Sequence, residues 1–202
     1  SNFYETEFSN VGRSVHTLAV KATNRFEATR DKVQKYLNAK HREEIIFTKG
    51  ATEAINLVAA SYGKKYINKG DEILITELEH HSNYVPWNFL RTEKGAVIRF
   101  AQVNESGDID IEEIKKLINN KTKIIAITHI SNVTGAVLPI SKIVDLAKEK
   151  NIPVLIDGTQ GAPHSEVDMQ KIGCDFYAIS CHKMYGPNGL GILYMKKKWI
   201  DD

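Results

Sequence analysis

One stretch decides how this sequence is read: Ser180-Cys181-His182-Lys183-Met184-Tyr185-Gly186-Pro187-Asn188-Gly189-Leu190-Gly191. Apolar runs at 175–179 and 191–195 lead into and out of it, so we expect a tight loop between two strands. Its glycines and proline predict a sharp turn of the backbone. A lysine here can be an ordinary solvated side chain, as most lysines are. The reactive neighbours of Lys183 favour a Schiff-base lysine instead, the amine that holds a carbonyl cofactor.

The composition is that of an ordinary globular protein and excludes several classes. The chain has 202 residues, of which 42% are hydrophobic and 26% charged, which suits one large domain. A net charge of +2 predicts no broad attraction to nucleic acid or to a membrane surface. Cys174 and Cys181 make no disulfide framework, which favours the reducing cytoplasm. No apolar run approaches the roughly 18 residues of a membrane helix.

Strands and helices alternate along the chain. Short apolar runs predict further strands at 45–48, 73–76, 96–100, 124–128 and 153–156, and helix signals appear at 17–38, 54–62, 111–118, 140–150 and from 83 onward. This order predicts an α/β fold, with a three-layer, mostly parallel seven-stranded sheet covered by helices on both faces. The strand at 191–195 is expected to run antiparallel to its predecessor. Residues 1–16 are expected to form an N-terminal arm and residues 17–202 the main domain.

Polar side chains follow the carboxyl ends of the predicted strands, where open α/β sheets bind their ligands. Five loops contribute them. These are Gly50 and Thr52, His80, Asn132, Asp157 and Gln160, and finally Ser180, His182 and Lys183. Each residue is a weak indication by itself, and their shared edge makes the site hypothesis stronger.

Several of these residues also have a simpler interpretation. The turn at 49–53 leads directly into a helix, so it is either an anion site at the helix start or a plain cap supplied by Thr52. His80 and His81 lack a third ligand at a metal-like spacing, so no metal is expected. His80 either stacks on a flat ring or is an ordinary loop histidine. Cys174 is interpreted as a packing residue.

Together the polar residues meet the requirements of pyridoxal phosphate. Asp157 ends an apolar strand and needs a donor or cationic partner, although a salt bridge or a cap would also satisfy it. The cofactor requires a lysine imine, an acid for its ring nitrogen and a phosphate anchor. Lys183 and Asp157 fit the first two needs, and His80 would cover the ring. Asn132 and Gln160 would bond the phenolic oxygen, and Thr52, Ser180 and His182 the phosphate.

Five segments carry a resemblance over nearly the whole chain: 52–58, 79–87, 127–133, 154–158 and 180–191. The sequence is similar to the large domain of class V aminotransferases, which use pyridoxal phosphate. Within them it most resembles the SUF-type cysteine desulfurases. The run that separates this group from more distant members is Glu79-His80-His81-Ser82-Asn83-Tyr84-Val85-Pro86-Trp87.

The resemblance implies a reaction and its partners. L-Cysteine would be converted to L-alanine, with its sulfur left as a persulfide on an enzyme thiolate. That sulfur would pass to an acceptor protein for iron–sulfur cluster assembly. Lys183 and His80 would be the catalytic residues of this chain, and the full-length protein would be a homodimer.

The sequence departs from the family pattern at several positions. Ala51 replaces a second threonine in the cradle, Cys181 replaces a glycine, and Gly12 stands before Arg13 where a histidine is frequent. The family's nucleophilic cysteine and its substrate-carboxylate arginine are expected beyond residue 202. We therefore expect a large domain without its C-terminal small domain, inactive when alone.

Other functions remain open at this point. One is a selenocysteine lyase or another class V lyase or aminotransferase. Another, of a different class, is a non-catalytic binding or scaffold domain that keeps the fold. A dehydrogenase-type nucleotide domain is disfavoured, because the first strand is not followed by Gly-x-Gly-x-x-Gly.

Overall fold

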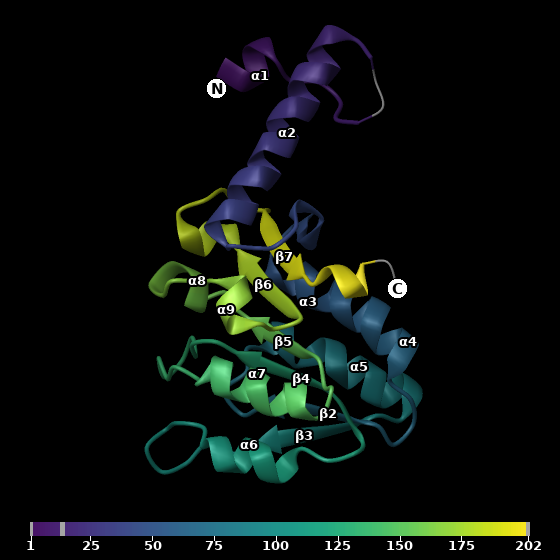
Figure 1. Cartoon of the computed structure of the whole chain (residues 1–202), viewed down its shortest axis with the longest axis vertical. Coiled ribbons are helices and arrows are strands. Elements are labelled where there is room, and N and C mark those ends of the chain that lie inside the picture. The colour runs from purple at the N-terminus through teal and green to yellow at the C-terminus, as the bar shows by residue number, and fades with distance from the viewer. Residues whose placement is uncertain (1, 13–14, 201–202) are drawn as a thin grey trace.

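The computed structural model describes residues 2–12 and 15–200, so the predicted arm residue Arg13 lies outside the described part. A single seven-stranded sheet forms the centre of the molecule, in the spatial order β1-β7-β6-β5-β4-β2-β3 (Figure 1). The predicted α/β fold class is confirmed. The strands are β1 (Ile45–Thr48), β2 (Glu72–Thr76), β3 (Val97–Ala101), β4 (Thr122–Thr128), β5 (Val154–Asp157), β6 (Phe176–Ser180) and β7 (Gly191–Met195).

The strand directions bring most carboxyl ends to one edge of the sheet. β7 is antiparallel to both β6 and β1, as predicted for β6, and the pairs among β2, β3, β4, β5 and β6 are parallel. β1 therefore runs in the same direction as β6. Gly191 pairs with both Thr48 and Ser180, and a Cβ there would lie 2.4 Å from the Gly50 Cα. Only glycine at 191 allows the two loops to approach this closely.

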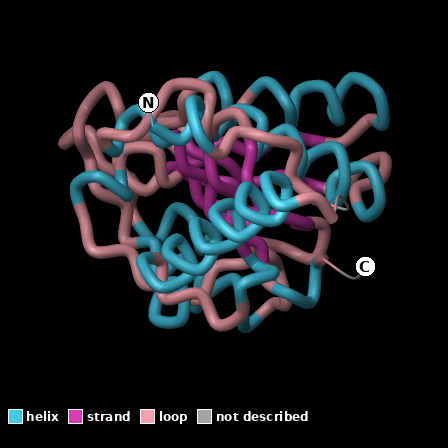
Figure 2. The backbone as a smooth tube through the Cα atoms, turned by 90° about the horizontal axis from the view of Figure 1, so that it is seen from above, coloured by secondary structure: helices cyan, strands magenta, loops and turns pink. Residues whose placement is uncertain are grey.

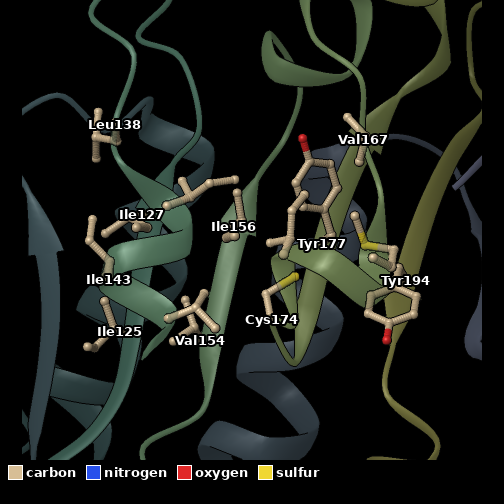
Figure 3. Packing of buried hydrophobic residues seen from close by; sticks show 14 of the residues in the cluster. Ile125, Ile127, Leu138, Ile143, Val154, Ile156, Val167, Cys174, Tyr177 and Tyr194 are labelled. Atoms are coloured by element: carbon tan, nitrogen blue, oxygen red, sulfur yellow. The ribbon is translucent and has the colours of Figure 1, made fainter. Parts of the chain in front are cut away.

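Both faces of the sheet are buried under helices (Figure 2). In β4, Ile125 and Ile127 belong to one core, and Ile124 and Ala126 to the other, which is the two-residue period of a strand. Figure 3 shows Ile143 close to strand residues of the first core. The first core is covered by α6 (Ile111–Leu117), α7 (Ile140–Glu149), α8 (Gly161–His164) and α9 (Met169–Ile172), and the second by α3 (Ala51–Val58) and α5 (Val85–Lys94).

Helices α1 (Asn2–Thr6) and α2 (Thr17–Tyr36) project from one end of the molecule (Figure 1). The expected arm thus begins with a helical turn. The base of α2 is fixed to the sheet by Arg30, whose guanidinium lies 5.3 Å from the Phe26 ring centre and 5.1 Å from that of Phe47. Arg30 also donates to the Ile45 carbonyl. The contact with Phe47 and the bond to the Ile45 carbonyl hold α2 against β1.

The helix predicted at 54–62 is longer than expected. α3 begins three residues earlier, at Ala51, and continues through a π-helical turn (Ala59–Gly63) into α4 (Lys64–Tyr66). α8, α9 and the 3-10 turns η1 (Arg42–Glu44), η3 (His81–Asn83), η4 (Cys181–Met184) and η5 (Lys197–Trp199) were not predicted. Within the described residues, every helix is too short or too polar to cross a membrane.

Candidate functional site

A cavity of about 230 Å³ opens at the carboxyl edge of the sheet, between loops that follow β1, β2, β4, β5 and β6. The structure thus brings all the predicted site residues together. The cavity is lined by Ala51, Thr52, His80, Asn132, Asp157, Gln160, Ser180, His182 and Lys183, and also by Ser82, Thr128, Ile130 and Thr159, which were not predicted. Thr128 ends β4, and the other three follow β2, β4 and β5, so a strand-end rule applied to every polar position would have identified all of them except the apolar Ile130.

The start of α3 and the end of β6 form one wall. The Ala51 N–H donates to Ser180 Oγ over 2.9 Å, a buried contact between segments far apart in the sequence. The Ala51 amide is therefore already used, so Ala51 contributes only its surface to the cavity wall. The Ser180 hydroxyl accepts this bond and keeps its own proton to donate. Exposed Thr52 adds a second hydroxyl in the first turn of α3. Such a helix start attracts anions.

Asp157 and Lys183 approach the same cavity from neighbouring strands. Asp157 ends β5 with 4% of its surface exposed, and its Oδ1 accepts the Thr159 N–H over 3.0 Å. Lys183 lies in η4, directly after β6, and its side chain is exposed. A buried carboxylate at a cavity wall requires a donor or a cation from whatever occupies the cavity. An acid and an amine are therefore available to one ligand.

The two adjacent histidines point in different directions. His80 lines the cavity, whereas His81 borders a separate hollow beside Tyr84 and Phe100. Their rings are nearly perpendicular, with centres 6.1 Å apart. The Ser82 N–H donates to His80 Nδ1 over 3.2 Å, so the neutral ring carries its proton on Nε2. In the described part of the chain, no three His, Cys, Asp or Glu side chains gather as ligands for one metal ion.

A buried histidine–tyrosine pair supports the loop that follows Asp157. His129 Nδ1 lies 2.8 Å from the Tyr177 hydroxyl, and the His129 N–H donates to the Asp157 carbonyl over 2.9 Å. Burial lowers the pKa of His129 and raises that of Tyr177. A Cβ at Gly161 would lie 2.1 Å from His129 Nδ1, so the loop packs directly on the ring. This His129–Tyr177 pair was not predicted from the sequence.

Both cysteines are inside the protein. Cys174 has no exposed surface, as expected of a packing residue, and Cys181 is 8% exposed. Burial raises the pKa of both thiols, so they are protonated near neutral pH. Cys181 is not among the described residues that line the cavity, although it follows Ser180 directly. Neither thiol has the surroundings of a reactive nucleophile.

The model of the aminotransferase class-V family matches residues 1–202. The chain belongs to this family. A probable cysteine desulfurase of Halalkalibacterium halodurans is 47% identical over 200 residues, which are 99% of this chain and 49% of that protein. The solved apo structure of a cysteine desulfurase from Thermococcus onnurineus superposes with a TM-score of 0.93 at 36% identity, over 99% of this chain and 50% of that one.

Another similar solved structure, described as SspA in complex with cysteine, has a TM-score of 0.90 at 29% identity. It is matched over 97% of this chain and 56% of its own. The chain therefore spans about half the length of these relatives.

Proposed function

We propose that this class V chain is the large, cofactor-binding domain of a SUF-type cysteine desulfurase that depends on pyridoxal phosphate. One observation carries the proposal: the Lys183 amine and the buried Asp157 carboxylate line one cavity with the start of α3. The names of the similar proteins support the choice of cysteine as substrate. The nearest alternative, a selenocysteine lyase, would use the same residues.

The donor set of the cavity fits this cofactor. Asp157 is buried and acidic, as a partner for a protonated ring nitrogen must be. Lys183 supplies the amine for the aldehyde carbon, and His80 presents a ring beside it. The α3 start with Thr52, Ser180 and His182 offers donors for the phosphate, and Asn132 and Gln160 offer amides for the phenolic oxygen. When bound, the cofactor would supply an electron sink for the substrate.

The residues of this chain then have separate tasks in converting L-cysteine to L-alanine. Lys183 would carry the proton that leaves or joins the substrate carbon atoms, because its exposed amine reaches the open cavity. His80 would present its Nε2–H to the same cavity. The sulfur requires a thiolate acceptor, and the buried thiols of Cys174 and Cys181 do not suit that task. We place that thiol outside this chain's described residues, and we expect the chain alone to be inactive.

The wider setting follows from the same proposal. The complete enzyme would act in the cytoplasm as a homodimer and would hand its sulfur to an acceptor protein for iron–sulfur clusters. A net charge of +2 gives no reason to expect nucleic acid or membrane as partners.

Cofactor binding tests the proposal directly. Adding pyridoxal phosphate to the purified chain should produce an absorption band near the edge of the visible range. Borohydride reduction should then fix the cofactor on the peptide that contains Lys183. The Lys183→Ala chain should lack both signals, while Lys116→Ala, a change at an exposed position of α6, should keep them.

Two outcomes would contradict the proposal. A band of equal strength in Lys183→Ala, or reduction onto a different lysine, would remove Lys183 from its role. The absence of any band in the unaltered chain would favour a scaffold domain. As a further check, alanine formation from L-cysteine by the unaltered chain should be no faster than by Lys183→Ala. Efficient turnover would show that the nucleophile is present after all.

A further inference from the structure

Glu79, the residue before His80, is the centre of a hydrogen-bond network that the proposed function does not use. The Thr76 hydroxyl donates to Glu79 Oε1 over 2.6 Å, and the Thr128 N–H donates to the same oxygen over 2.9 Å. Thr76 ends β2 and Thr128 ends β4. The carboxylate thus joins the ends of two neighbouring strands.

The other carboxylate oxygen reaches the helix that follows. Asn83 Nδ2 donates to Glu79 Oε2 over 2.7 Å, and Trp87 Nε1 donates to Asn83 Oδ1 over 3.1 Å. Neither Asn83 nor Trp87 has exposed surface. Because η3 begins right after His80 and ends at Asn83, both ends of the segment that carries His80 are tied to one carboxylate.

His80 itself is held only locally. Its Nδ1 is bonded to Ser82, two residues away in the same turn, and its side chain is exposed. The position of the ring therefore depends on the backbone from Glu79 to Asn83. We propose that Glu79 is a positioning residue that holds His80 at the wall of the cavity. The consequence for the cofactor depends on the proposed function, whereas the network itself does not.

The ionisation of Glu79 gives the network a measurable property. Burial raises the pKa of Glu79 to about 7, against its hydrogen bonds from Thr76, Asn83 and Thr128, and the Asp157 carboxylate on β5 acts in the same direction as burial. Glu77 and His81 border the same hollow as Glu79. An ionised carboxylate accepts all three bonds, whereas protonation turns one acceptor into a donor. The bond from Asn83 should respond, and the Trp87 indole with it.

The first test uses the protein without cofactor. In proton–nitrogen NMR spectra, the Trp87 indole N–H, distinguished from Trp199 by a Trp199→Phe chain, should shift with pH around a midpoint near 7. Glu79→Gln keeps the length of the side chain and should abolish this shift. Glu77→Gln, which changes an exposed neighbour that accepts the Val103 N–H, should leave it intact. A shift that persists in Glu79→Gln would overturn the assignment.

The second test asks whether Glu79 acts through His80. His80→Ala should weaken pyridoxal phosphate binding roughly three- to tenfold, the range of an aromatic ring contact. Glu79→Ala should weaken it to a similar extent, Glu79→Gln less, and the Glu79→Ala/His80→Ala chain no more than His80→Ala alone. Effects that multiply in the double variant would contradict positioning through His80. If the unaltered chain binds no cofactor, the proposed function fails, while the NMR result still decides whether the network exists.

Discussion

At the scale of single residues, the site depends on glycines that allow loops to approach buried rings. Gly161 is one such case, because an added Cβ would lie 2.1 Å from His129 Nδ1. The imidazole cannot withdraw easily, since Nδ1 is bonded to the Tyr177 hydroxyl at 2.8 Å. The loop that carries Asp157 and Gln160 would have to move instead.

We therefore expect Gly161→Ala to lower the free energy of unfolding by about 1–3 kcal/mol, the usual cost of overpacking. Urea denaturation measures this change. His129→Ala removes the ring, so adding Gly161→Ala to that chain should cost less than adding it to the unaltered chain, with a coupling of about 1–2 kcal/mol. Additive losses would mean that the alanine methyl group is accommodated elsewhere.

At the scale of elements, the Asp175 carboxylate links η5 to the sheet. Asp175 Oδ2 accepts the Val154 N–H over 3.1 Å, and Oδ1 accepts the Trp199 indole N–H over 3.0 Å. Trp199 also stacks on Phe176, with ring centres 5.9 Å apart. Asp175 therefore joins β5, β6 and η5.

We expect Asp175→Ala to lower the free energy of unfolding by about 3 kcal/mol, because hydrogen bonds to a buried charge are lost and their donors are left unpaired. Lys198→Ala, which removes the ion pair from an exposed lysine to the same carboxylate at 2.8 Å, should cost less than about 1 kcal/mol. Urea denaturation with tryptophan fluorescence measures both. Equal losses in the two chains would show that the ion pair, and not the buried bonds, holds η5.

The elements that the sequence predicted well are those with a strong periodic pattern. The strands at 45–48 and 191–195 have the predicted bounds, because polar or glycine residues stand at their ends. α8 and α9 have four residues each, too few to establish a helical period, and they were missed. The start of α3 was placed late, because Ala51 continues the helix right after Gly50 without a distinctive cap.

The candidate site was predictable to the extent that it follows strand ends. Asp157, Ser180 and Lys183 each stand at or just after an apolar run, so a topological rule was enough to bring them together. Glu79 and His129 also follow strands, but their importance comes from partners far away in the sequence. The bond from Thr128 to Glu79 links the ends of β4 and β2, and the bond between His129 and Tyr177 links the end of β4 to β6. No local pattern carries such information.

At the scale of the whole molecule, the antiparallel direction of β7 helps to form the site. The other six strands run the same way, so five of the cavity's loops leave one edge. β7 runs in the opposite direction and therefore begins at this same edge, with Gly191 between Thr48 and Ser180. This arrangement lets the start of α3 reach Ser180. A parallel seventh strand would place its first residue at the far edge, so Gly191 would no longer stand between Thr48 and Ser180.

The free energy of unfolding of the whole molecule should vary with pH because Glu79 titrates. Its pKa is raised from 4.5 to about 7 by burial, so the ionised form is less favourable in the folded chain than in the unfolded one. The stabilisation contributed by protonated Glu79 is fully present below the pKa of the unfolded chain. It is lost as the pH rises through the pKa of the folded chain. The lowered pKa of His129, also caused by burial, acts in the opposite sense, because its protonation opposes folding as the pH falls.

Comparing the unaltered chain with Glu79→Gln separates these effects, because His129 is present in both. The free energy of unfolding of Glu79→Gln, minus that of the unaltered chain, should rise between about pH 5 and about pH 8 by up to about 3 kcal/mol. Urea denaturation across this range gives the difference directly. Glu77→Gln, a change at a neighbouring exposed position, is the matched control. A constant difference for Glu79→Gln would mean that Glu79 ionises as freely in the folded chain as in the unfolded one.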